Sequence, residues 1–177
     1  MAELSRLLLA ALPVAVLAGC GGDKEAAFAP PCPRPSIPRD AADLFHFRGN
    51  GRDITDSVLE GRVTGVGGDC TRDGPNTVVT NVSVGIDLTR GPAARGRAAD
   101  VAYFIAVSDG EKILDKRVYT LRAEFPENTD RLRLSGDSVE LRLPVTRQKT
   151  AAAYTITVGF QLTPAELEFN RQRRPGR

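Results

Sequence analysis

The sequence is poor in the side chains that most enzymes use for catalysis. It contains one histidine, His46, and three cysteines among 177 residues. A hydrolase of the Ser-His-Asp type would need His46, and its candidate partners Asp40, Asp43, Asp53 and Ser57 lie near it in the chain. However, no Gly-x-Ser-x-Gly elbow presents a nucleophile, and apolar and aromatic residues flank the histidine. We therefore expect a structural histidine and no enzyme activity, and a hydrolase built around His46 is the weakest hypothesis.

Signatures of metal and nucleotide sites are also missing. The loop 50–56 and the pair Asp69 and Asp73 offer oxygen atoms, but EF-hand spacing is absent and Arg52 lies inside the loop. Turn formation by Asn, Gly and Asp explains these residues as well. The glycine-rich run 61–68 is not followed by Gly-Lys-Ser/Thr. We expect neither a metal nor a cofactor.

The chain has no strong excess of one charge. Its 24 basic and 22 acidic residues give a net charge of +2, which does not predict binding to nucleic acid. An apolar content of 41% is enough for a hydrophobic core. The length corresponds to one domain.

A long apolar run lies near the beginning of the chain, over residues 7–18, interrupted by Pro13. At about a dozen residues it is shorter than the ~20 that a membrane-spanning helix needs. It suits the central region of an export signal peptide. The run ends in Leu17-Ala18-Gly19-Cys20, a pattern that resembles the lipobox of bacterial lipoproteins.

The resemblance implies that residues 1–19 are a signal peptide that is removed and that Cys20 becomes a lipidated first residue. An ordinary secretory peptide with a chance cysteine is the alternative, and a retained anchor helix is another. In lipoproteins of Gram-negative bacteria, an aspartate directly after the cysteine favours retention at the inner membrane. Gly21 occupies that position, so the resemblance implies a lipid-anchored protein on the periplasmic face of the outer membrane.

The two other cysteines then remain in an oxidising compartment. We predict a disulfide between Cys32 and Cys70. Two free thiols that act as metal ligands are the alternative, but a single histidine and the lack of Cys-x-x-Cys argue against it. Residues 20–38 are rich in proline, glycine and alanine, which disfavours helix and interior strand. We predict a lipidated tether there and a folded domain over residues 39–177.

Alternation of apolar and polar side chains predicts strands through most of this domain. The clearest strand covers residues 76–89, with valine, isoleucine and leucine at every second position except Thr80. Residues 100–107 are apolar on both faces, so we expect this strand at the centre of a sheet. Further strands are expected over 57–66, 111–124, 131–134, 138–145 and 153–162, with tight turns at 108–110 and 135–137.

About seven strands without helical periodicity between them predict an all-β antiparallel β-sandwich, similar to immunoglobulin-like domains in strand number. One short helix is expected near the C-terminus, ahead of a basic tail. There Thr163 is a capping residue, Pro164 takes the first helical position and Glu166 the third.

Arginine side chains are the remaining candidates for binding. Arg90, Arg95 and Arg97 lie in a loop with glycine and proline, and guanidinium groups match phosphates and carboxylates. Solvated surface arginine is the alternative. We expect a non-enzymatic structural or interaction component of the cell envelope, with the membrane as one partner through Cys20 and an envelope protein as another. The alternative is a binding module for an anionic envelope component, such as a lipid headgroup, lipopolysaccharide or peptidoglycan.

Overall fold

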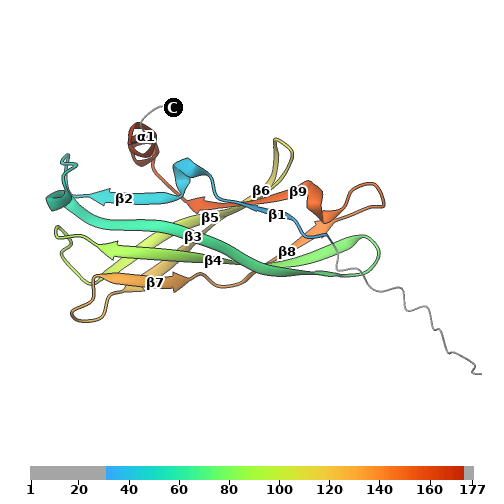
Figure 1. Ribbon diagram of the computed structural model, residues 1–177, viewed down its shortest axis with the longest axis horizontal. Helices are drawn as coiled ribbons and strands as arrows, with labels where there is room; N and C mark the ends of the chain where they lie inside the picture. Colours follow the sequence, from blue (N-terminus) through green and yellow to red (C-terminus); the bar gives the residue numbers. More distant parts are fainter. Residues whose placement is uncertain (1–30, 174–177) are drawn as a thin grey trace, which may run out of the picture.

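The computed structural model describes residues 31–173, which form two β-sheets and one C-terminal helix (Figure 1). The first sheet has the order β1-β9-β5-β6, with β1 (Arg34–Ser36), β9 (Tyr154–Phe160), β5 (Ala98–Asp109) and β6 (Lys112–Glu124). The second has β2 (Asp43–Phe47), β3 (Ser57–Arg72), β4 (Thr77–Arg90) and β7 (Arg131–Ser135) in order, with β8 (Val139–Pro144) also paired to β4. The predicted β-sandwich is confirmed.

The short helices are η1 (Arg39–Ala41), η2 (Ile54–Asp56), η3 (Ala151–Ala153) and α1 (Pro164–Gln172). All described strand pairs are antiparallel except that of β1 with β9. The strand β1 falls inside the stretch that the sequence suggested as a tether. Proline has no N–H group to donate to a neighbouring strand, so it is confined to strands at the edge of a sheet. The strand β1 contains Pro35 and accordingly lies at the edge of its sheet.

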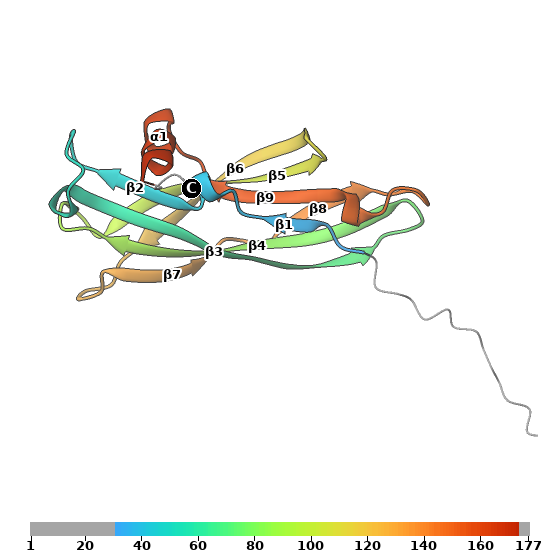
Figure 2. The same cartoon turned by 45° about the horizontal axis from the view of Figure 1, so that its top comes forward.

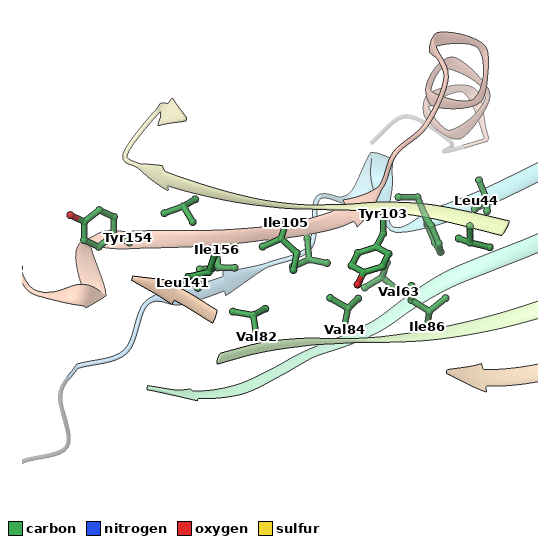
Figure 3. Packing of buried hydrophobic residues seen from close by; sticks show 14 of the residues in the cluster. Leu44, Val63, Val82, Val84, Ile86, Tyr103, Ile105, Leu141, Tyr154 and Ile156 are labelled. Atoms are coloured by element: carbon green, nitrogen blue, oxygen red, sulfur yellow. The ribbon is translucent and has the colours of Figure 1, made fainter. Parts of the chain in front are cut away.

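Alternating apolar side chains fill the space between the sheets. The inward side chains of β4 are at most 2% exposed at Val78, Val82, Val84, Ile86 and Leu88. Figure 3 shows Val82, Val84 and Ile86 opposite Tyr103, Ile105 and Ile156 of the other sheet. Thr80 is buried in the same row, and its hydroxyl donates to the carbonyl of Asp69 at 3.0 Å. This bond satisfies the one polar side chain in the row.

The strand β5 lies between β9 and β6, as its two apolar faces predicted. The hairpin to β6 turns at Gly110, whose φ of 58° is left-handed and suits glycine. The hairpin prediction at residues 108–110 is therefore confirmed. The inner face of β5 carries the buried side chains of Val101, Tyr103, Ile105 and Val107.

The prediction of a tight turn at residues 135–137 is wrong. Ser135 pairs with Gly85 and Val139 pairs with Val82, so β7 and β8 run in one direction along the same edge of β4. The interruption between them carries one extra residue and resembles a bulge. Gly136 is needed there because a Cβ atom would lie 2.5 Å from the Tyr103 hydroxyl oxygen. The glycine thus permits a close approach to the core and does not reverse the chain.

The disulfide between Cys32 and Cys70 is confirmed, with 5.8 Å between the Cα atoms. It joins the chain just before β1 to the far end of β3. The two cysteines are 38 residues apart in sequence, and closing such a loop restricts the unfolded chain by about 4 kcal/mol in the loop-entropy model.

Candidate functional site

The most distinctive cluster of polar and aromatic side chains lies where α1 packs on β2. This helix follows β9 and stands over β2, which is the edge strand of the second sheet (Figure 2). Its start is the capping box that the sequence predicted: Glu166 donates its backbone N–H to the Thr163 hydroxyl, and its carboxylate accepts from the Thr163 N–H at 2.7 Å. The cap fixes the direction in which α1 leaves the sheet.

Asn170 holds the helix on the sheet. This side chain is 6% exposed, and its Nδ2 donates to the carbonyl oxygens of Asp40 at 2.8 Å and Asp43 at 2.7 Å. These carbonyls belong to the turn η1 and to the first residue of β2. Sequence reasoning missed Asn170, because a single asparagine on a short polar helix carries no local signal of a partner about 130 residues earlier.

Three phenylalanine rings complete the contact between β2 and α1. Phe169 packs edge-on against Phe45 and Phe47, with ring centroids 5.6 and 5.2 Å apart. Arg173 lies over the Phe45 ring at 4.0 Å and Arg52 over the Phe47 ring at 5.2 Å. Both arginines are exposed, so each presents a guanidinium group that is positioned by an aromatic face.

His46 also lies in this cluster and is paired with Glu166. Its Nε2 is 2.9 Å from Oε1 of Glu166, and the two side chains are 40% and 18% exposed. The second carboxylate oxygen of Glu166 accepts from the backbone and hydroxyl of Thr163. Glu166 therefore both closes the capping box with Thr163 and orients His46. Sequence reasoning sought acidic partners near His46 and identified Glu166 only as a cap.

The pair borders an open cleft of about 170 Å³, lined by Phe45, His46, Phe47, Gly49, Arg52, Ala165, Glu166 and Phe169. A Ser-His-acid hydrolase needs a nucleophile beside the imidazole. Neither serine, threonine nor cysteine is among these described lining residues. Ser57 points elsewhere, since it is buried and its hydroxyl donates to Glu60. The geometry offers aromatic faces and charged groups for recognition, and it supplies two of the three parts of a triad.

The three arginines of the predicted anion site have different environments. Arg90 pairs with the Asp130 carboxylate at 2.7 Å, and Arg97 donates to the carbonyl oxygens of Phe125 and Thr129. These contacts fasten the loop 91–97 to the loop 125–130. Arg95 is exposed and has no partner within residues 31–173. Of the three, Arg95 is the one whose guanidinium group faces solvent without a contact inside the fold.

The acidic residues of loop 50–56 serve the turn. The Asp56 carboxylate accepts from the Asp53 N–H and closes a capping box at η2. Within the described part of the chain, no group of three or more His, Cys, Asp or Glu side chains is arranged to hold a metal ion.

Cys20 and the lipobox lie outside the described residues. In residues 31–173, no helix is long and apolar enough to cross a membrane. Comparisons with family models, curated proteins and solved structures found no match for the chain. The fold defines the class of the molecule as a two-sheet β-sandwich with a C-terminal helix.

Proposed function

We propose that this chain is a lipid-anchored lipoprotein of the periplasm, and that its β-sandwich is a non-enzymatic structural or interaction component of the cell envelope. The observation that carries the proposal is the pairing of Cys32 with Cys70. Structural disulfides persist in oxidising compartments. The pairing also leaves Cys20 as the remaining cysteine of the chain, at the position where the lipobox pattern places the lipidated residue.

Substitution of Cys20 by serine tests the anchor. In cells that receive labelled palmitate, the parent protein is expected to carry label and to fractionate with membranes, whereas Cys20→Ser carries none and keeps its signal peptide. The double variant Cys32→Ser/Cys70→Ser is the matched control, because it removes two cysteines and is expected to keep the label. A Cys20→Ser protein of unchanged size in the same membrane fraction would contradict the proposal.

The residue after the lipidated cysteine supports an outer-membrane location, because Gly21 stands where an aspartate would favour the inner membrane. Replacement of Gly21 by aspartate is expected to move the protein to the inner-membrane fraction of a density gradient, while Gly21→Ala leaves it unchanged. Equal distributions of the two variants would remove the assignment to the outer membrane.

The cleft between β2 and α1 is the surface we propose for an envelope protein partner. Its support is the pairing of exposed guanidinium groups with fixed aromatic faces, since arginine and aromatic residues are enriched at protein interfaces. A photo-crosslinking amino acid at Arg52 is expected to trap a partner in cells. The same label at Arg117, an exposed residue on β6 at an edge of the other sheet, is the control. Equal yields from both positions would contradict the proposal.

Binding of an anionic envelope component is the second candidate, and the exposure of Arg95 and Arg52 favours it. The loops that carry them are adjacent, because Ala93 donates its backbone N–H to the carbonyl of Ser57, just after η2. The parent protein is expected to sediment with peptidoglycan or anionic vesicles at low salt and to be released by salt. Arg95→Ala should weaken this binding, and Arg97→Ala is unsuitable as a test because it also releases the loop 125–130.

A further inference from the structure

We infer that the anchored protein stands with the β3–β4 hairpin and the β8–β9 loop against the phospholipid headgroups, and with the cleft between β2 and α1 directed away from them. This inference rests on the proposed lipid at Cys20. It adds an orientation and a membrane-contacting surface, neither of which follows from lipidation alone.

The described chain begins at one end of the sandwich. Cys32 is bonded to Cys70, which lies two residues before the end of β3. Immediately afterwards, β1 pairs with the beginning of β9, where Arg34 is opposite Thr155. Figure 1 shows the start of the coloured chain beside the β3–β4 hairpin and the β8–β9 loop, with β2 and α1 toward the other end. We call the first the proximal end and the second the distal end.

The length of chain before Cys32 limits the distance of the proximal end from the lipid. Residues 21–31 separate Cys20 from Cys32, and a fully extended segment of this length spans at most ~40 Å. The strand β4 has 14 residues and runs between the two ends, which corresponds to roughly 45 Å at strand spacing. The distal end can therefore reach the headgroups only if the segment is close to full extension or the domain lies on its side.

The chemistry of the proximal end suits a phospholipid surface. Arg34, Arg72 and Arg147 are exposed there, and the described residues offer them no partner. Guanidinium groups form paired hydrogen bonds with phosphates.

Two acidic residues of the proximal end form ion pairs with basic residues of the protein itself. Asp109 pairs with Lys149, and Asp73 pairs with Arg142, which also contacts Glu140. Asp69 and Glu111 remain exposed carboxylates at this end. Because Arg142 carries one charge against two carboxylates, its trio with Asp73 and Glu140 keeps one negative charge. Four exposed cations, Arg34, Arg72, Arg147 and Lys112, therefore face three remaining acidic charges, an excess of one positive charge.

A single introduced tryptophan can test the orientation, because the chain contains none. Gln148→Trp places the probe in the β8–β9 loop and Glu127→Trp places it between β6 and β7, both at exposed positions. The chain from Cys20 onward would be coupled to a maleimide phospholipid through the Cys20 thiol, since the other cysteines are bonded to each other. It would then be incorporated in phosphatidylethanolamine–phosphatidylglycerol vesicles with dansyl headgroup acceptors.

Energy transfer to the dansyl groups is expected to be several-fold greater for Gln148→Trp than for Glu127→Trp. Equal transfer from both positions, or greater transfer from residue 127, would overturn the orientation. Protein with Cys20→Ser gives the background from unanchored chains. Because the lipid is attached chemically, a negative result contradicts the orientation, while absence of lipid on Cys20 in cells contradicts the proposed function.

Discussion

Asn170 fastens α1 to η1 and to the start of β2 through two hydrogen bonds. Replacement by alanine would remove both hydrogen bonds from its Nδ2 and leave the carbonyls of Asp40 and Asp43 without this donor. We expect Asn170→Ala to lower the free energy of unfolding by about 1–3 kcal/mol, as measured by urea denaturation. Gln172→Ala is the control, because Gln172 is exposed and bonds only to Glu168 of its own helix. Equal losses for the two variants would show that the two hydrogen bonds of Asn170 do not stabilise the fold.

Tyr103 predicts how stability changes at alkaline pH. Burial raises the pKa of its hydroxyl, and the charges of Asp137 and Tyr119 raise it further. The folded state therefore holds this proton more tightly than the unfolded chain. Its contribution is fully present below the ordinary tyrosine pKa, and it is lost as the pH rises through the higher folded-state pKa.

The measurement is urea denaturation at a series of pH values from about 9 upward, spanning the ordinary tyrosine pKa of ~10. We expect the free energy of unfolding of the parent protein to fall more steeply with pH than that of Tyr103→Phe. Tyr119 and Tyr154 are present in both proteins, so the difference isolates Tyr103. If the free energy of unfolding changes with pH equally in the two proteins, the raised pKa of Tyr103 is contradicted.

At the scale of elements, the interrupted edge formed by β7 and β8 depends on a glycine. A methyl group at Gly136 would meet the Tyr103 hydroxyl oxygen at 2.5 Å, so we expect Gly136→Ala to cost about 1–3 kcal/mol through overpacking. Tyr103→Phe removes the closest atom, and the double variant should therefore lose less stability than the sum of the two single variants. Gly96→Ala, where a Cβ meets nothing within 4 Å, is the control. If the stability loss of the double variant equals the sum of the two single losses, the contact between residues 136 and 103 is refuted.

The helix α1 depends on Glu166, which both caps it and pairs with His46. Glu166→Ala is expected to lower the free energy of unfolding by about 1–2 kcal/mol, because a capping contact alone contributes about 1 kcal/mol. Glu168→Ala, an exposed residue two positions later, is expected to cost less than about 0.5 kcal/mol. Thermal unfolding of the two variants compares them directly, and an equal effect would mean that neither the capping contact nor the pair with His46 stabilises the helix.

Elements with regular alternation could be predicted from the sequence, because one buried and one exposed face leave a period of two. This explains why β4, β5 and β9 were identified. The start of α1 was identified from a different signal, its capping residues. Residues 135–137 misled the prediction because Ser-Gly-Asp suits a tight turn, while the actual reason for Gly136 is a tyrosine from the opposite sheet. The same limit applies to the pair of His46 and Glu166, whose contact exists only once α1 packs on β2.

At the scale of the whole molecule, the disulfide joins the N-terminal arm to the sandwich. Cys32→Ser/Cys70→Ser is expected to lower the free energy of unfolding by about 4 kcal/mol, since the unfolded chain regains the freedom of the closed loop. Urea denaturation of the oxidised parent and the double variant measures this difference. A parent protein that loses no stability on full reduction would contradict it.

The central claim is that Cys20 is joined to lipid while Cys32 and Cys70 are joined to each other. The most direct measurement is the intact mass of the protein purified from cell envelopes, followed by the mass of its N-terminal peptide. The account predicts a chain that begins at Cys20, carries a diacylglyceryl group on that residue, and has two hydrogens fewer than the reduced form. A mass that corresponds to an unmodified Cys20, or to a chain that retains residues 1–19, would contradict it.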